Sequence, residues 1–302
     1  MSMRSRALTS TLTALVACCL AAVSADSVAQ SCYSTKVPAP QVRQQTIVVV
    51  DRTTHADPSA VASYRQAVVA AASRPGKRVV VLSFAGIAPG QDLKKHLDRV
   101  IDGPISDPEV IENLPIRPFK ASQKCVREAL GKWPEELNEV LGRVIESRKP
   151  TLLERSEIVH ALSNALRTFA APGMNSFMYV YSDGLENGEG PGALRFYGRD
   201  GRPRKIDAMA ELARLPQRVR ARPVPALGPV SVRWAGLLAL EPAAQVKYVD
   251  AEALNQLQLF WTHLLTGWGV DNVQVERILL DAGVASVESR PLATAGALQR
   301  RP

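Results

Sequence analysis

Two kinds of segment alternate along the middle of the chain. Short apolar runs rich in valine and isoleucine are separated by longer segments whose apolar residues recur every three or four positions. Continuous apolar runs are typical of strands that are buried on both faces of a parallel sheet. Segments with the helical period are typical of helices that cover such a sheet. The pattern therefore predicts an α/β fold with a mostly parallel central sheet flanked by helices, Rossmann-like in architecture.

The individual elements can be placed from the same pattern. Predicted strands cover residues 46–50, 78–84, 177–181 and 228–239, with an edge segment near 110–114 and a short strand at 194–197. Predicted helices cover residues 60–73, 92–101, 122–147, 157–169, 206–215 and 250–265. Pro134 is expected to split the helix at 122–147 into two, because proline removes a helical hydrogen bond.

The start of the chain has the features of a secretory leader. Residues 1–25 have a basic beginning, a mostly apolar middle and small residues at the cleavage site, and Ala29 offers a second cleavage position. A rival interpretation is a bacterial lipobox that ends at Cys18 and would place a lipid there. The first interpretation predicts a periplasmic or secreted bacterial protein, and the second predicts a lipid-anchored envelope protein. No later stretch has the apolar length that spans a bilayer.

Domain boundaries and cysteines follow from this interpretation. Residues 26–44 are expected to be a linker, 45–270 the folded domain, and 271–302 an extension that ends in a disordered tail. Of the four cysteines, Cys32 and Cys125 lie outside the leader, and we expect them to form a disulfide in an exported chain. The alternative is two unpaired thiols.

The charge of the chain argues against one class of partner. The formal net charge is +8. The excess is diffuse and is densest at residues 199–222, where arginines are interspersed with prolines. Nucleic-acid binding is disfavoured, because no basic stripe or basic helix stands out. Weak attraction to anionic surfaces is the simpler consequence of the charge.

Two predicted strands end in an aspartate. Asp51 follows the strand at 46–50, and Asp183 follows the strand at 177–181. A helix begins between them, near Ser156. Ligands of open parallel sheets bind beyond the carboxyl ends of the strands, so these side chains share the edge where a ligand is expected.

These residues resemble the motif of the von Willebrand factor type A family. That family holds a divalent cation through Asp-x-Ser-x-Ser after the first strand, a threonine before a central helix and an aspartate after the fourth strand. The resemblance covers residues 45–270 and assigns the cation ligands to Asp51, Thr53, Ser156 and Asp183, with Thr151 as a second candidate for the place of Ser156. It implies a binding module in which the partner's carboxylate often completes the cation's coordination.

His55 departs from the motif, because it stands where the second serine belongs. Mg²⁺ prefers hard oxygen ligands and rarely accepts imidazole. The other four residues still offer oxygens for Mg²⁺ or Mn²⁺. His55 could point away, replace a water-mediated contact, shift the preference toward Mn²⁺ or Zn²⁺, or mark a site without metal. In that last case Asp51 caps a turn, and Asp183 belongs to an Asp-Gly turn.

The predicted function is therefore that of an exported binding or scaffold protein of the cell envelope, with a cation and a protein partner at the sheet edge. One alternative is a metal-independent component of a secretion, conjugation or surface assembly. Another is a metal-dependent phosphoester hydrolase that uses Asp51 and Asp183. The sequence favours a binding module over an enzyme, because no general base or nucleophile has the spacing that hydrolysis needs.

Overall fold

A computed structural model describes most of the chain between Ser31 and Ile278. The described ranges are 31–85, 93–147, 156–170, 172–188, 193–198, 203–220, 228–240 and 250–278. The expected signal peptide, the lipobox at Cys18, Thr151 and the expected tail lie outside the described residues.

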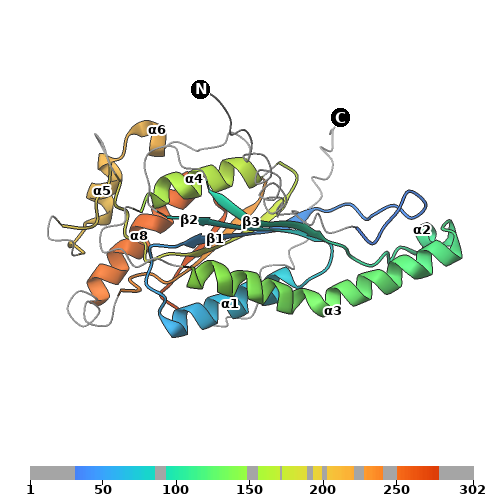
Figure 1. Cartoon of the computed structure of the whole chain (residues 1–302). Coiled ribbons are helices and arrows are strands. Elements are labelled where there is room, and N and C mark those ends of the chain that lie inside the picture. Colours follow the sequence, from blue (N-terminus) through green and yellow to red (C-terminus); the bar gives the residue numbers. More distant parts are fainter. Residues whose placement is uncertain are drawn as a thin grey trace, which may run out of the picture. The chain divides into compact units, whose positions relative to one another are not determined.

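The core of the fold is a six-stranded sheet in the order β3-β2-β1-β4-β5-β6. The sheet lies between helices (Figure 1). The strands are β1 (Gln44–Asp51), β2 (Lys77–Phe84), β3 (Lys94–Ile101), β4 (Asn175–Tyr181), β5 (Val230–Ala235) and β6 (Asn272–Val275). All neighbouring strands are parallel except β2 and β3, which are antiparallel. The prediction of an α/β fold with a mostly parallel sheet is confirmed.

The central strand is apolar because both of its faces are buried. Successive side chains of a strand point to opposite faces. Ile47 and Val49 therefore join the hydrophobic core on one side of the sheet, while Val48 and Val50 join the core on the other side.

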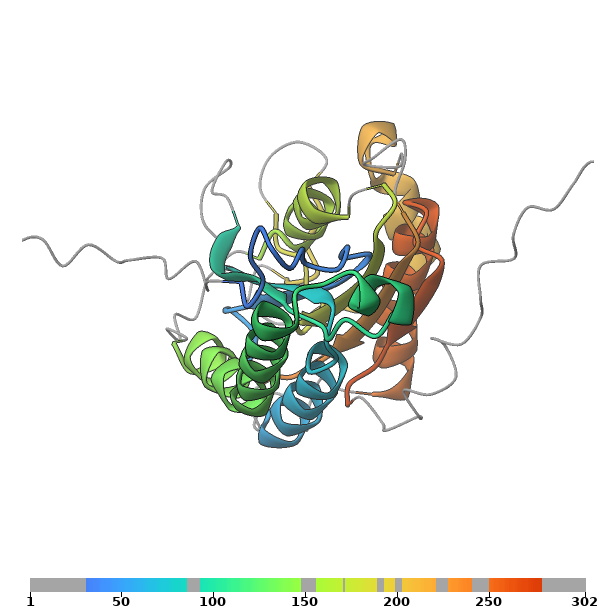
Figure 2. The same cartoon turned by 90° about the vertical axis from the view of Figure 1, so that its right-hand side faces the viewer.

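Helices cover both faces (Figure 2). The helices α1 (Pro58–Ala72) and α3 (Ile116–Glu146) supply the core on the side of Val48. The opposite core comes from α4 (Ile158–Phe169), α5 (Ala208–Arg214) and α8 (Ala251–Gly267). Two short helices, α2 (Pro108–Glu112) and α6 (Gln217–Arg220), also belong to the described part of the chain. Among the described residues, no helix has both the length and the apolar character that a bilayer crossing requires.

The prediction of a helix at 92–101 is wrong, because residues 94–101 form β3. This strand pairs with β2, and Arg78 holds Asp98 across the pair through two hydrogen bonds of 2.8 and 2.9 Å. Its lysines are typical of an edge strand, where charge discourages pairing with other molecules. The pairing with β2, which is distant in the sequence, makes this segment a strand, and the spacing of its own apolar residues does not show it.

Two predictions around α3 are also wrong. The expected edge segment near 110–114 falls largely on α2, which Asp107 caps by accepting a hydrogen bond from the amide of Glu109. The expected break at Pro134 is absent, and α3 continues from Ile116 to Glu146. The flanking residues Trp133 and Leu137 are both buried, so packing on each side of the proline offsets the lost hydrogen bond.

Near the end of the chain the sheet extends past Val270, since β6 adds a sixth strand that the weak apolar pattern did not predict. Residues 194–197 form only isolated bridges, Asn187 with Arg195 and Tyr197 with Pro203, where the sequence predicted a short strand.

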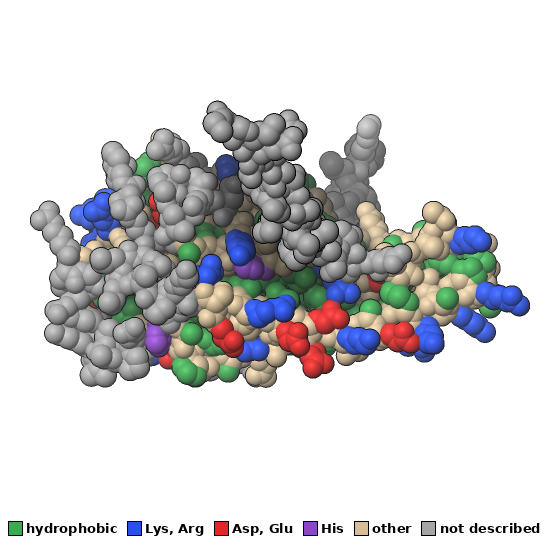
Figure 3. Space-filling model, viewed as in Figure 1, with side chains coloured by type: hydrophobic (Ala, Val, Ile, Leu, Met, Phe, Trp, Pro, Cys, Tyr) green, Lys and Arg blue, Asp and Glu red, His purple; other side chains and the backbone are tan. Residues whose placement is uncertain are grey.

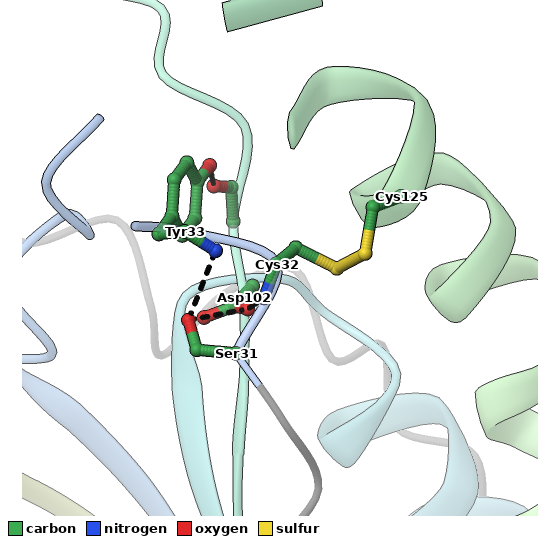
Figure 4. The surroundings of a disulfide bond; sticks show 6 residues. Ser31, Cys32, Tyr33, Asp102 and Cys125 are labelled. Atoms are coloured by element: carbon green, nitrogen blue, oxygen red, sulfur yellow. Dashed lines mark hydrogen bonds between the residues drawn. A yellow bond between two sulfur atoms is a disulfide. The ribbon is translucent and has the colours of Figure 1, made fainter. Parts of the chain in front are cut away.

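The predicted disulfide is confirmed. Cys32 and Cys125 are bonded, with their Cα atoms 5.6 Å apart (Figure 4). Beside it, Asp102 accepts hydrogen bonds from the hydroxyl of Ser31 at 3.0 Å and from the amide of Cys32 at 2.7 Å. The segment that was expected to be a linker is therefore attached to the folded domain at its start.

Candidate functional site

The candidate site lies where the strand order reverses. From β1 in the middle of the sheet, β2 and β3 follow one after the other to one edge, and β4, β5 and β6 follow to the opposite edge. The order of the strands therefore reverses between β1 and β4, which is the switch point. Open parallel sheets bind their ligands in the crevice at the carboxyl ends of the strands at such a point. Asp51 ends β1, and the pairing of Val50 with Tyr181 places it beside Ser182.

The alternation of side chains selects the face. Val49 and Val180 both pack in the core under α4, so Asp51 and Ser182, each two positions further along, point to the same side. Ser156 comes two residues before α4 begins and approaches from the helix side. Three separate segments thus converge on one point.

Hydroxyl groups surround the carboxylate of Asp51. Its Oδ1 accepts hydrogen bonds from Thr53, from the amide at 2.9 Å and from the hydroxyl at 2.6 Å. Its Oδ2 accepts hydrogen bonds from the hydroxyls of Ser156 at 2.8 Å and Ser182 at 2.9 Å. The side chain is almost fully buried. Asp51, Thr53 and Ser156 therefore meet as the sequence predicted.

The carboxyl group of Asp51 is buried without an opposite charge from any basic side chain that the structure describes. Burial raises the pKa of Asp51, and the hydrogen bonds from Thr53, Ser156 and Ser182 oppose the rise. Among the described residues, no lysine or arginine forms an ion pair with this carboxylate. A buried carboxylate without an opposite charge is costly, so the arrangement favours either a proton or a cation at this position.

Asp183 lies at the same edge and is tied to the segment after β1. Its amide donates a 2.8 Å hydrogen bond to the hydroxyl of Thr54, and its Oδ1 accepts one of 2.9 Å from the amide of Leu185. The hydroxyl of Tyr197 lies 3.5 Å from its Oδ2. Burial raises the pKa of Tyr197, and the negative charges of Asp183 and Asp51 raise it further.

Two hydrogen bonds to its backbone carbonyl hold His55 in place. Its carbonyl accepts hydrogen bonds from the Tyr181 hydroxyl at 2.9 Å and from the Asp57 amide at 3.0 Å. The second hydroxyl group of this segment is that of Thr54, and it accepts the hydrogen bond from the amide of Asp183. In the described part of the chain, no three His, Cys, Asp or Glu side chains gather as metal ligands. An ion at this edge would therefore depend on hydroxyl oxygens as well as on carboxylates.

A third buried carboxyl group, that of Glu186, accompanies the two aspartates. Its Oε2 accepts a 2.9 Å hydrogen bond from the amide of Val159 in the first turn of α4. Burial raises the pKa of Glu186 to about 8, and the charges of Glu157 and Asp51 add to the rise. A helix N-terminus stabilises a negative charge, but here desolvation outweighs that effect.

Three polar residues of the site were not predicted as such: Ser182, Thr54 and Glu186. Ser182 follows β4 directly, and the register of β1 with β4 places it beside Asp51. The sequence alone does not give this register. The signal for Thr54 was a second hydroxyl in the Thr-Thr pair. Glu186 gave no signal, because its burial depends on how the loop after Gly184 folds under α4.

These features define an α/β protein with a carboxylate and hydroxyl cluster at the topological switch point of its sheet. No family model matches the chain, and no curated protein matches it.

Solved structures give distant likenesses. The hypothetical protein BatB from Bacteroides thetaiotaomicron is 14% identical, with a TM-score of 0.31, over 78% of this chain and 91% of that chain. Proximal thread matrix protein 1 from the mussel byssus is 12% identical, also with a TM-score of 0.31, over 76% of this chain and 48% of that chain. Likenesses at this level support neither a family assignment nor a function.

Proposed function

We propose that the chain is an exported binding module that holds a divalent cation, Mg²⁺ or Mn²⁺, at the switch point of its sheet and binds a protein partner there. The observation that carries this proposal is the environment of Asp51. Its buried carboxylate receives four hydrogen bonds, and no basic side chain among the described residues pairs with it. A cation would supply the missing opposite charge.

The donor set suits a hard cation. Thr53 and Ser156 donate their hydroxyl protons to Asp51, so the lone pairs of these oxygens are free to face an ion. Asp183 would supply a second carboxylate from the neighbouring strand. Ligands of this kind, all oxygen, are those that Mg²⁺ and Mn²⁺ prefer. A bound cation would also lower the pKa of Asp51, since it favours the ionised carboxylate.

Two further observations support the cellular setting. The disulfide between Cys32 and Cys125 is typical of proteins that fold in an oxidising compartment. The leader-like residues 1–25, or the lipobox at Cys18, would direct the chain to the bacterial envelope. A protein partner with an exposed carboxylate would then complete the coordination of the cation.

Calorimetric titration with Mg²⁺ and with Mn²⁺ tests the proposal. We expect saturable binding to the wild-type chain and an affinity at least tenfold weaker, about 1.4 kcal/mol, for Asp51→Asn. This variant keeps the volume of the side chain and removes its charge. Glu139→Gln removes an exposed carboxylate on α3 and serves as the matched control, which should bind as the wild type does.

Equal heats from the wild type and Asp51→Asn would remove the cation from the proposal. Circular dichroism and thermal unfolding of both variants show whether the substitution has changed the fold, so a loss of binding can be attributed to the charge.

A metal-independent scaffold is the second candidate, because the oxygens of Asp51 already have hydrogen-bond donors within the chain. In that case the cluster is structural and joins β1, β4 and the start of α4. Capture of a partner from envelope extract would then be the same with and without a chelator. The cation-dependent module predicts that the chelator releases the partner.

A further inference from the structure

Residues 104–127, called the arm below, comprise the loop after β3, α2 and the first three turns of α3. They extend beyond the sheet at the end that carries α2 (Figure 1). No residue of α2 is buried, and in the whole arm only Ser122 and Val126 are buried. The arm therefore contributes almost nothing to the core of the domain.

The arm nevertheless carries large apolar side chains. Ile116 is 69% exposed and Val110 is 40% exposed, which is unusual for residues of this type. Apolar and basic side chains lie together at this end of the molecule (Figure 3). Contiguous apolar surface with a polar surround commonly marks a site of protein association.

Charges on the arm are separated by sign. The acidic residues belong to α2 and its cap: Asp107, Glu109 and Glu112. The basic residues occur at intervals of three, four and three, and so share one face of α3: Arg117, Lys120, Lys124 and Arg127. The first turn of α3 contains no acidic residue, so the positive end of the helix dipole adds to this basic face.

These opposite charges do not neutralise one another within the chain. Lys124 approaches Glu128 at 3.8 Å. Among the described residues, none of the other six charged side chains of the arm forms an ion pair. Their charges are therefore available to a second molecule.

We propose that the arm is a self-association surface, whose occupant is the arm of a second copy of this chain. In a two-fold arrangement the acidic α2 of each copy faces the basic face of α3 in the other, with Val110 and Ile116 packed between them. A two-fold interface needs such a self-complementary patch. An anionic membrane or a uniformly acidic partner would be attracted by α3 and repelled by α2.

The arm is also held in place at its base. Cys125 lies in the arm, and its disulfide joins α3 to the segment that Asp102 holds through Ser31 and Cys32 (Figure 4). A surface that is fixed in advance loses less conformational entropy when it associates.

Charge reversal with rescue tests this inference. Light scattering coupled to gel filtration should find a dimer of the purified chain. Lys120→Glu with Lys124→Glu should weaken the dimer at least tenfold, and so should Glu109→Lys with Glu112→Lys. An equimolar mixture of the two double variants should restore a dimer, because each then meets the opposite charge.

Two further variants sharpen the test. Ile116→Asn should weaken the dimer, since it removes apolar contact. Lys94→Glu with Lys205→Glu makes the same change of charge at exposed positions outside the arm and should leave the dimer intact. Unfolding curves confirm that each variant is folded.

Three results would overturn the inference: a wild-type chain that stays monomeric from micromolar to millimolar concentration, a dimer that both reversals leave unchanged, or a mixture that does not restore the dimer. A monomer that binds vesicles containing anionic lipid through Lys120 and Lys124 would assign the arm to a membrane instead.

Discussion

The buried carboxyl group of Glu186 should make the stability of this protein fall as the pH rises. Its ordinary pKa is 4.5, and burial against Val159 raises the pKa to about 8 in the folded chain. Between these values the folded state holds a proton that the unfolded state has released. Stability decreases with pH wherever the folded state binds more protons, so the loss occurs between about pH 4.5 and pH 8.

The size of the effect follows from the two pKa values. Each pKa unit corresponds to about 1.4 kcal/mol, so the difference between 4.5 and about 8 corresponds to a loss of about 5 kcal/mol. Relaxation and water penetration on opening would reduce that figure. Asp51 acts in the same direction, because burial also raises its pKa.

Urea unfolding in the presence of a chelator, across this pH range, measures the effect. We expect the wild type to lose several kcal/mol and Glu186→Gln to lose clearly less, because the glutamine does not titrate. Glu139→Gln, on the exposed face of α3, should keep the wild-type slope. Identical slopes for the wild type and Glu186→Gln would refute the reasoning.

Two further predictions concern stability. Replacing Cys32 and Cys125 with serine should cost up to about 4–5 kcal/mol in urea unfolding, because the disulfide joins residues 93 positions apart, and a cost under about 1 kcal/mol would contradict the chain-entropy account. Gly184→Ala should lower the melting temperature for two reasons. The backbone φ angle of Gly184 is 74°, and the added Cβ would lie 2.5 Å from Cδ1 of Leu237 and 3.0 Å from Nε1 of Trp261. An unchanged melting temperature would show that the loop relaxes freely.

The sequence predicted what local patterns determine. The apolar runs that form β1, β2 and β4 predict strands in the middle of a sheet, because a sheet that is covered on both faces buries all of their side chains. The aspartate at the end of β1 and the one after β4 were assigned to one edge, because parallel strands share a carboxyl end. The meeting of Asp51, Thr53 and Ser156 follows from that topology.

What the sequence did not predict depends on partners that are distant in the chain. β3 is a strand because β2 lies beside it, and its charged residues gave no strand pattern of their own. Pro134 stays within α3 because Trp133 and Leu137 are buried on either side. Ser182 joins the site through the register of β1 with β4, and Glu186 joins it through the fold of a loop under α4.

The proposed function requires a divalent cation at the switch point between β1 and β4. A crystal of the chain grown or soaked with Mn²⁺ and measured for anomalous scattering tests this requirement most directly. We expect a manganese peak bounded by Asp51, Thr53, Ser156 and Asp183. A map with manganese at other positions, or with none in a crystal of saturated protein, and no peak among these four side chains, would contradict the claim.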